Sequence, residues 1–275
     1  MATESDSHGK QLIMFGFNIQ LSRAITLYTP SRIISLVPSQ TELLYYLGLT
    51  NQVIGITKFC VHPKEWHQTK TRIGGTKTLN IESIKSLNPD LVIANKEENV
   101  REQIEDVAKD FPVWVSDVNT LEDAYRMIAD VGRLVQEEAA AEMLVQKVKA
   151  AFVPLQTTND KLQTAYLIWK DPYMTVGGDT FINDMLTKAG FENVFADRQR
   201  YPVITIEELL TANCELLLLS SEPYPFKQKH IEELQVHLPH TRIILVDGEI
   251  FSWYGSRLLL VPSYFKRLQE QLERL

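Results

Sequence analysis

Two side chains that can bind metal ions stand two residues apart in FCVHP, residues 59–63. The thiolate of Cys60 and the imidazole of His62 both suit a soft or borderline metal ion. Two ligands do not complete such a site, however, and a cysteine is most often a small buried residue. We therefore predict no bound metal and retain both residues as candidate walls of a ligand pocket.

The chain lacks the motifs of common enzyme families. It contains no G-x-S-x-G, no H-E-x-x-H, no dinucleotide-binding fingerprint and no paired-cysteine metal motif. Asp171 and Asp179 could join Cys60 and His62 in a catalytic group, but no spacing requires it. We expect a binding protein with no catalytic residue and no cofactor. An enzyme on the same fold is the alternative.

Polar residues interrupt the segment RIISLVPSQTELLYYLGL, residues 32–49. The segment begins with a β-branched run typical of a buried strand and ends with apolar residues at helical spacing before a glycine. Between them, PSQT at 38–41 predicts a turn in which Ser39 or Thr41 caps the helix. Ligands bind at strand ends in open α/β sheets, so Ser39 and Gln40 are candidate ligand contacts.

A second polar segment, GGTKT at 74–78, is a flexible loop before a predicted helix. Its amides and the Lys77 side chain could meet an anion. The spacing is not that of a nucleotide-binding P-loop, and an ordinary turn is the alternative. We expect Thr76 and Lys77 to form part of a pocket wall.

Aromatic residues gather in predicted loops of the second half. They are Trp169, Tyr173, Tyr201, Tyr224, Phe226, Trp253 and Tyr254. Large rings on loops suit a flat, partly apolar ligand better than a sugar phosphate or a bare ion, although some of them will plug the ends of a sheet. Our candidate ligand contacts are Trp169, Tyr173, Tyr201, Trp253 and Tyr254. Arg257, close to the last two rings, is either a charged ligand contact or a member of a surface ion pair.

The elements that must position these residues alternate between strands and helices. Strands are predicted at residues 33–37, 53–57, 91–94, 113–115, 165–169, 216–220 and 243–246. Such alternation is typical of an α/β protein with parallel sheets built from β-α-β units. From residue 121 to residue 155, apolar residues recur at helical spacing, which predicts one long helix or two helices with a break near Gln136.

An internal repeat indicates two lobes of common design. IESIKSLNPDLVI at 81–93 matches IEELLTANCELLL at 206–218 with a constant offset, 206 − 81 = 125. Each copy predicts a short helix, capped by Asn80 or Thr205, that leads into a buried strand. We predict an α/β lobe, a helical region with an interlobe helix and a second α/β lobe at residues 12–118, 119–156 and 157–275, with a ligand cleft between the lobes.

Composition limits the class of protein. The 275 residues are 44% hydrophobic and 23% charged, which allows a substantial core. The formal net charge is −7 and no basic cluster is present, which disfavours a nucleic-acid binder. Two cysteines exclude a disulfide framework, and no apolar run reaches the length of a membrane span. Residues 1–11 are polar and predicted to be disordered, and the LIMFGF run after them is too short for a signal-peptide core.

Residues 32–49, the segment IGGTKTLNIESIKSLNPDLVIA at 73–94 and the long helical region together resemble the substrate-binding proteins of ABC importers for cobalamin and iron-siderophore complexes. The resemblance covers nearly everything from about Leu12 onward. It implies two Rossmann-like lobes with parallel sheets joined by one long α-helix. It also implies that Glu82 and Glu207 dock against arginines of the membrane permease, although acidic residues are favoured in the first turn of any helix.

The same resemblance implies a class of ligand and a cellular compartment. The ligand is a metal chelate or corrinoid (cobalamin-like, haem-like or an iron-siderophore), with loop 74–78 at its border. The resemblance also keeps open that His62 is an axial ligand to a metal held in a macrocycle. Familiar cobalamin binders carry a tryptophan in that loop, so its absence here disfavours the usual cobalamin contacts. The implied compartment is the periplasm. With Met1 as the native start and no signal peptide, the alternative is a cytoplasmic carrier. We expect a monomer that binds no nucleic acid and delivers its ligand to an ABC importer permease.

Overall fold

The computed structural model describes residues 13–15, 29–155 and 161–274. Its contacts divide the chain into two compact units. The first runs to Asp117 and includes Met127–Glu142, and the second comprises Val118–Arg126 and the chain from Met143 onward. Residues 1–11, which are predicted to be disordered, lie outside the described residues. The predicted boundary between the helical region and the second lobe, at residues 156 and 157, also lies outside them.

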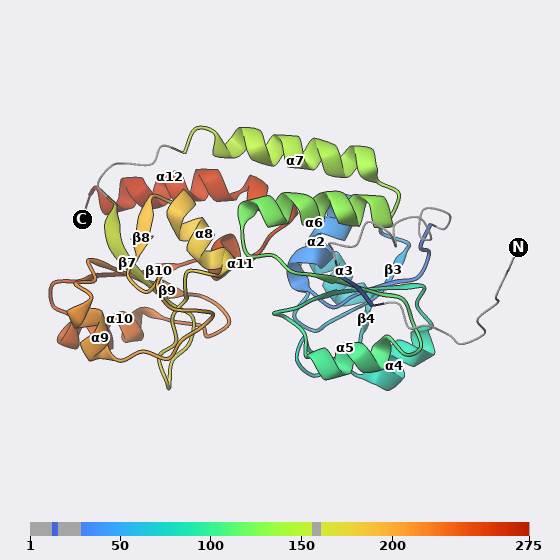
Figure 1. Ribbon diagram of the computed structural model, residues 1–275, viewed down its shortest axis with the longest axis horizontal. Coiled ribbons are helices and arrows are strands. Elements are labelled where there is room, and N and C mark those ends of the chain that lie inside the picture. The colour runs from blue at the N-terminus through green and yellow to red at the C-terminus, as the bar shows by residue number, and fades with distance from the viewer. Residues whose placement is uncertain (1–12, 16–28, 156–160, 275) are drawn as a thin grey trace, which may run out of the picture. The chain divides into compact units, whose positions relative to one another are not determined.

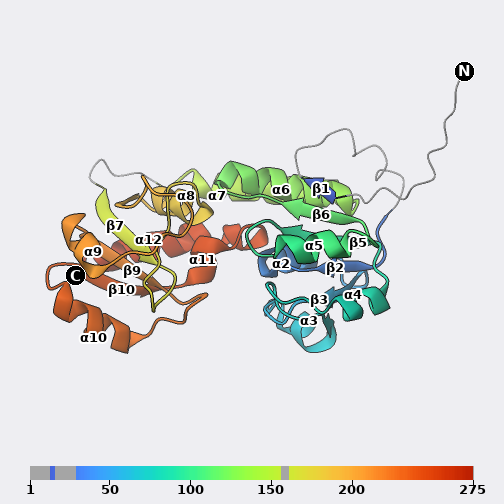
Figure 2. The same ribbon diagram turned by 60° about the horizontal axis from the view of Figure 1, so that its bottom comes forward.

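The first unit contains a parallel sheet with the strand order β1-β6-β5-β2-β3-β4 (Figures 1 and 2). Its strands are β1 (Ile13–Phe15), β2 (Ile33–Ser35), β3 (Val53–Ile56), β4 (Thr71–Arg72), β5 (Leu91–Asn95) and β6 (Val113–Ser116). The central strands β2 and β5 pair in parallel, with Ile34 opposite Val92. Both are fully buried, as short β-branched strands are when a sheet is covered on both faces.

Helices flank this sheet. They are α2 (Pro38–Tyr46), α3 (Lys64–Thr69), α4 (Ile81–Leu87) and α5 (Arg101–Val107). Helices α4 and α5 lie together on one face (Figure 1), where Ile84 and Ile104 belong to the same buried cluster as Val92. This apolar packing fixes the sheet, so the polar residues at the carboxyl ends of its strands have a rigid base.

The second unit contains a parallel sheet with the strand order β10-β9-β7-β8. Its strands are β7 (Leu162–Leu167), β8 (Phe191–Asn193), β9 (Leu216–Ser220) and β10 (Arg242–Val246). The helices are α8 (Phe181–Lys188), α9 (Ile206–Thr211), α10 (Gln228–His237), α11 (Gly248–Ser252) and α12 (Val261–Leu272), with a 3₁₀ turn, η1 (Ser256–Leu259). Helices α9 and α10 cover one face (Figure 1), where Leu209 and Leu234 pack in one cluster with Leu217. Phe251 and Phe265 pack against each other on α11 and α12, at a ring distance of 5.1 Å.

The internal repeat is present in the fold. Strands β6-β5-β2-β3 of the first sheet have the same order as β10-β9-β7-β8 of the second. Asn88 and Asn213, which correspond in the repeat, both adopt the left-handed conformation, with φ of 43° and 51°. The backbone amides of Arg32 and Gln163 donate to the matching carboxylates of Asp90 and Glu215, over 2.9 and 2.8 Å. The predicted caps are also confirmed, since the side chains of Asn80 and Thr205 each accept a hydrogen bond from their helix.

The helical region consists of two helices, α6 (Leu121–Leu134) and α7 (Glu138–Phe152). Of the two alternatives predicted for residues 121–155, the structure therefore has the pair of helices, and a single interlobe helix stays a prediction. The predicted break near Gln136 is confirmed, since Gln136 has φ of 59°, a conformation that a helix cannot include. A Cβ on Gly132 would lie 2.4 Å from that of Ala141, so the two helices approach closely at a position that requires glycine. The division into units falls inside both helices.

Two further expectations need correction. The PSQT segment is the first turn of α2, and Val37 is the N-cap, so neither Ser39 nor Thr41 caps the helix. Proline at the first helical position is a start signal in its own right, because it has no amide hydrogen to leave unpaired. Strands β1, β4 and β8, of two or three residues each, were not predicted. No helix in the described residues is both long and apolar enough to span a membrane.

Candidate functional site

A buried polar network lies at the carboxyl ends of β5 and β6 in the first unit. The side-chain amide of Gln40 donates to Ser116 Oγ, and Asn95 Nδ2 donates to the same oxygen over 3.0 Å. Ser116 in turn donates to the Ala94 carbonyl oxygen over 3.2 Å. Gln40 is fully buried, and its Oε1 has no hydrogen-bond partner among the described residues. Gln40 thus joins α2 to β6, and Ser39, also buried, lies beside it on α2. Ligand contact by either side chain stays a prediction.

A second group of buried polar side chains surrounds Cys60. Thr41 Oγ1 lies 2.8 Å from Ser35 Oγ and 3.1 Å from Cys60 Sγ, and Thr57 Oγ1 lies 3.2 Å from that sulfur. Cys60 is fully buried, and burial raises the pKa of its thiol. His62 is only partly buried. Within the described ranges, no group of three or more His, Cys, Asp and Glu residues could hold a metal ion. Cys60 is a core residue, and contact of His62 with a chelated metal stays an open alternative.

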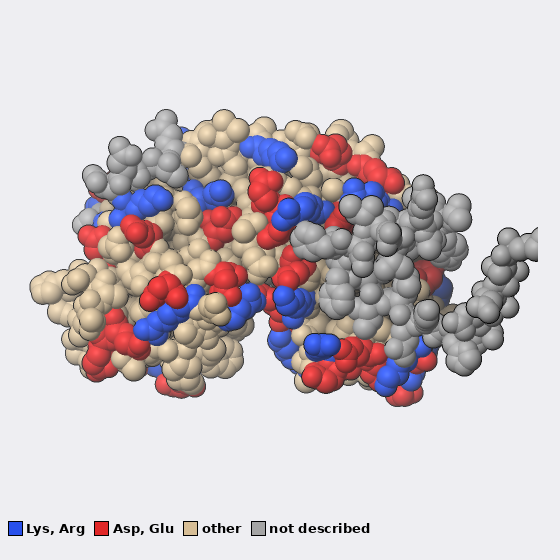
Figure 3. All heavy atoms as spheres, viewed as in Figure 1, with Lys and Arg blue, Asp and Glu red and all other residues tan. Residues whose placement is uncertain are grey.

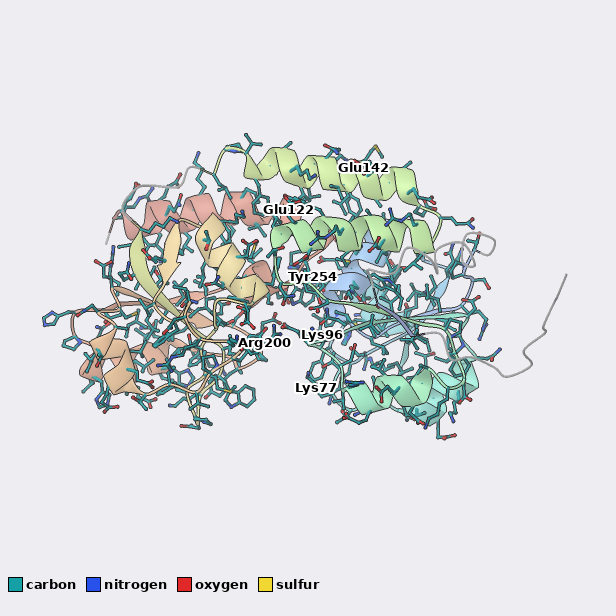
Figure 4. The ribbon with its side chains drawn as sticks, in the orientation of Figure 1. Lys77, Lys96, Glu122, Glu142, Arg200 and Tyr254 are labelled. Atoms are coloured by element: carbon teal, nitrogen blue, oxygen red, sulfur yellow. The ribbon has the colours of Figure 1, made fainter. Side chains whose placement is uncertain are left out.

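Loop 74–78 is tied to the segment after β5. Lys77 Nζ donates to the Glu97 carbonyl oxygen, and Asn99 Nδ2 donates to the Thr76 carbonyl oxygen over 3.1 Å. The Thr76 side chain is buried, whereas Lys77 is exposed at the edge of the unit (Figure 4). These bonds make the loop a fixed wall, where the sequence suggested a flexible one.

The second unit carries an aromatic assembly of Trp169, Tyr224, Phe226 and His230 after the carboxyl ends of β7 and β9. The Trp169 and Tyr224 rings lie 5.7 Å apart, the Tyr224 and Phe226 rings 4.8 Å and the Phe226 and His230 rings 5.5 Å. Phe226 and His230 are buried, but Trp169 is 41% exposed. The assembly therefore presents one large ring to solvent on a buried aromatic base.

Tyr173 and Tyr201 are both half-buried. Burial raises the pKa of the Tyr173 hydroxyl. The Arg200 guanidinium lies 5.7 Å from the centre of the Tyr201 ring, and Arg200 Nη1 donates to Asn119 Oδ1 over 3.2 Å. The Arg200 backbone amide donates to Asp179 Oδ1, so that carboxylate holds the loop. Both tyrosines stay candidate ligand contacts.

Trp253, Tyr254 and Arg257 are all buried, with exposed fractions of 6, 6 and 9%. Trp253 Nε1 donates to Glu222 Oε1 over 2.8 Å, and Arg257 Nη1 lies 2.7 Å from Glu249 Oε2. The Tyr254 ring packs edge-on against a phenylalanine ring of α8 at 5.6 Å. The ion pair of Arg257 is therefore buried, whereas the alternative in the sequence was an ion pair on the surface. These residues pack the end of the second sheet, and ligand contact by them stays a prediction.

An open pocket of about 580 Å³ lies at the carboxyl ends of β9 and β10. Its lining residues are Ser221, Glu222, Leu245, Val246, Asp247 and Glu249. Three of the six are acidic, so this pocket disfavours a carboxylate or phosphate group of a ligand.

Glu82 and Glu207 occupy equivalent exposed positions in the first turns of α4 and α9. Each lies two residues after the capping residue of its helix. Hydrogen bonds from its own backbone amide and from Thr205 hold the pKa of Glu207 below its ordinary value. The Glu207 carboxylate is thus available as a surface charge at neutral pH. On the face shown in Figure 3, acidic and basic side chains are interspersed.

His230, Ser116 and Asn95 were missed by the sequence analysis. His230 lies at the third position of α10, where its ring accepts the hydrogen bond that a Glu or Gln accepts in a capping box. The KxxH spacing of Lys227 and His230 is not a known capping signal. Asn95 and Ser116 are the last residues of β5 and β6, each one residue beyond the predicted strands at 91–94 and 113–115, and that position was the available signal.

The chain matches one protein-family model and is similar to several known proteins. The model of the periplasmic binding protein family matches residues 33–239. The ABC transporter substrate-binding lipoprotein YvrC of Bacillus subtilis is 28% identical over 248 residues, which cover 84% of this chain and 77% of that protein. A vitamin B12-binding protein of Vibrio parahaemolyticus is 29% identical over 195 residues, which cover 69% and 70% of the two chains. The periplasmic haem-binding protein HutB of Vibrio cholerae has a similar fold, with a TM-score of 0.74, 18% identity and coverage of 88% of this chain and 98% of that one.

Proposed function

Because the chain belongs to the periplasmic binding protein family, we propose that it binds a metal chelate or corrinoid outside the cytoplasm and delivers it to an ABC importer. The relatives support this class of ligand, since those compared include a vitamin B12-binding protein and a haem-binding protein. Membership of a family of binding proteins favours binding over catalysis, and over the alternative of an enzyme on this fold.

The single observation that carries the proposal is the exposed ring of Trp169. Of the four tryptophans in the chain, Trp66, Trp114 and Trp253 are buried, whereas Trp169 is 41% exposed. It follows the carboxyl end of β7 and rests on Tyr224, 5.7 Å away. A large ring fixed at the carboxyl edge of a parallel sheet suits stacking against a flat ligand.

The first unit has polar groups near its strand ends. Loop 74–78 has no aromatic residue, and the neighbouring strand ends carry the buried side chains of Asn95 and Ser116, which are hydrogen-bonded to each other. A few placed polar groups usually orient a ligand whose affinity comes from apolar contact. The proposed ligand is therefore a cobalamin-like corrinoid, a haem-like ring or an iron-siderophore, without the tryptophan contact of familiar cobalamin binders in this loop.

The proposal is tested by titrating the protein with cyanocobalamin, haemin and ferrichrome. Trp169 fluorescence should be quenched by the chelate that binds, because that ring is exposed. The absorption spectrum of the bound chelate should be recovered unchanged after denaturation, since a binding protein does not convert its ligand. No saturable quenching by any of the three chelates would reject this class of ligand. A chemically altered chelate would instead support an enzyme.

We further propose that Glu82 and Glu207 are the contacts with the importer permease. Their equivalent places in the two units support this, as does their exposure. Two equal charges at equivalent positions suit a partner that presents a basic group to each unit.

A further inference from the structure

His230 is buried at the beginning of α10 in a single protonation state. Its Nδ1 accepts a hydrogen bond from the Lys227 backbone amide over 2.8 Å. An acceptor nitrogen carries no proton, so the ring is neutral and its hydrogen is on Nε2. That nitrogen lies 3.4 Å from the hydroxyl of Tyr224, and the residue is 4% exposed.

The ring of His230 connects the two loops that carry the exposed tryptophan. It packs against Tyr224 and Phe226, both at 5.5 Å between ring centres. Tyr224 in turn packs against Trp169, and its backbone amide donates to the Ile168 carbonyl oxygen over 3.3 Å. The orientation of Trp169 therefore depends on the loop that His230 holds in place.

The charges around His230 oppose its protonation. Lys170 faces it from the segment after β7, Lys227 from the N-cap of α10 and Lys229 from the helix itself. Glu233 is the acidic neighbour, but Lys170 Nζ lies 2.7 Å from its Oε1 and partly neutralises it. Tyr224, from the segment after β9, faces the ring with its hydroxyl group. The amino end of a helix also disfavours a cation.

Burial, followed by Lys170 and the other lysines, lowers the pKa of His230. The unfolded chain therefore takes up this proton at a higher pH than the folded protein does. The stability that neutral His230 contributes is present above the ordinary pKa of about 6.5 and is lost as the pH falls through the lower folded value.

We propose that His230 is a positioning residue that makes the Trp169 surface dependent on pH. When the ring is neutral, it holds the first turn of α10 and the Tyr224 loop. When it is protonated, Nδ1 can no longer accept the Lys227 amide hydrogen, and the loop under Trp169 loosens. Ligand affinity then falls in acid. This last consequence rests on the proposed function, whereas the loosening does not.

The free protein tests the structural part. Hydrogen-exchange protection factors of the Lys227 amide should fall about fivefold between about pH 7.5 and about pH 5, the effect of one lost neutral hydrogen bond. His230→Gln should abolish this pH dependence and retain the protection, since glutamine at this position accepts the same bond without titrating. His240→Gln, at an exposed histidine after α10, is the matched control and should behave as the wild type.

Binding of cyanocobalamin and haemin tests the functional part. Whichever chelate binds should lose affinity about fivefold over the same pH interval in the wild type and not in His230→Gln. Protection that does not change with pH, or that changes equally in His230→Gln, would overturn the inference. If the protection behaves as expected and neither chelate binds at any pH, a cobalamin-like or haem-like ligand is excluded while the role of His230 in the fold stands.

Discussion

The guanidinium of Arg257 lies over the ring of Trp253, 4.7 Å from its centre. Each partner also holds one acid of the neighbouring pocket, since Arg257 pairs with Glu249 and Trp253 donates to Glu222. These two acids follow different strands, β9 and β10. The stacked pair therefore joins the ends of two strands and is part of the structure of the second unit.

Arg257→Met should lower the free energy of unfolding by about 2 kcal/mol, because it removes the cation of the buried pair with Glu249 and the stacking on Trp253. Urea denaturation measures this. Arg101→Met is the control, since Arg101 forms an exposed pair with Glu105 and should change the stability by less than about 0.5 kcal/mol. Unchanged stability together with weaker chelate binding would show that Arg257 reaches the ligand instead.

Trp169→Ala should weaken binding of the cognate chelate at least about tenfold, because a stacking surface is lost. The melting temperature should hardly change, since the ring is 41% exposed. The matched change Trp114→Ala removes a buried ring from β6 and should destabilise the protein by about 3–5 kcal/mol. Equal affinity in Trp169→Ala and the wild type would exclude Trp169 from the ligand site.

Ser116→Ala should destabilise the first unit by about 1–3 kcal/mol, because Gln40 then loses the acceptor for its buried amide. Gln40→Met should cost less, since it removes that donor together with the buried Oε1 that has no partner in the described residues. Chemical denaturation of the two variants and of the double variant measures the coupling between the two positions. If Gln40→Met were the more damaging change, Oε1 would have a partner such as a buried water.

Neither cysteine should react with a disulfide reagent in the native protein at about pH 8. Burial raises the pKa of the Cys60 thiol, and it raises that of Cys214 to about 11. Both side chains are also closed to the reagent, with exposed fractions of 0 and 6%. Absorbance of the released thiolate should indicate no fast thiol in buffer and both thiols in guanidinium chloride. A fast phase in buffer that disappears in Cys60→Ala would show that the segment around Cys60 opens.

Changing Glu82 and Glu207 together to Ala should abolish uptake of the cognate chelate by cells that carry the importer, while the chelate affinity of the purified protein stays the same. In this proposal, each of the two carboxylates contacts the permease and neither contacts the ligand. Glu102→Ala, in the first turn of α5, and Glu232→Ala, in the middle of α10, change exposed glutamates and are the controls. Weaker chelate binding in the double variant would place these glutamates in the ligand site.

Much of the fold could be predicted from local patterns. Strand β9 was predicted with its observed bounds, because a run of four leucines is too apolar for any place except a covered sheet. The caps at Asn80 and Thr205 followed from side chains that satisfy free amides. The order of the strands within a sheet depends on long-range pairing, which local patterns do not report. Only the internal repeat indicated that the two halves have the same strand order.

The candidate site was harder to predict, because burial decides what a polar or aromatic residue does. Trp169 and Trp253 look alike in sequence, but a partner in the segment after β9 covers Trp253, whereas Trp169 keeps one side open. His230 acts through a bond to the backbone of Lys227, which depends on the ring orientation and not on spacing alone. Local sequence carries no signal for such contacts.

Because both native thiols are buried, the protein is suited to site-specific labelling at introduced cysteines. Gln68 on α3 and Val236 on α10 are exposed and belong to different units. A cysteine introduced at each position would be the reactive thiol of its unit, without removal of Cys60 or Cys214. Energy transfer between dyes at the two sites would then report the separation of the units in solution, with and without a chelate, on single molecules.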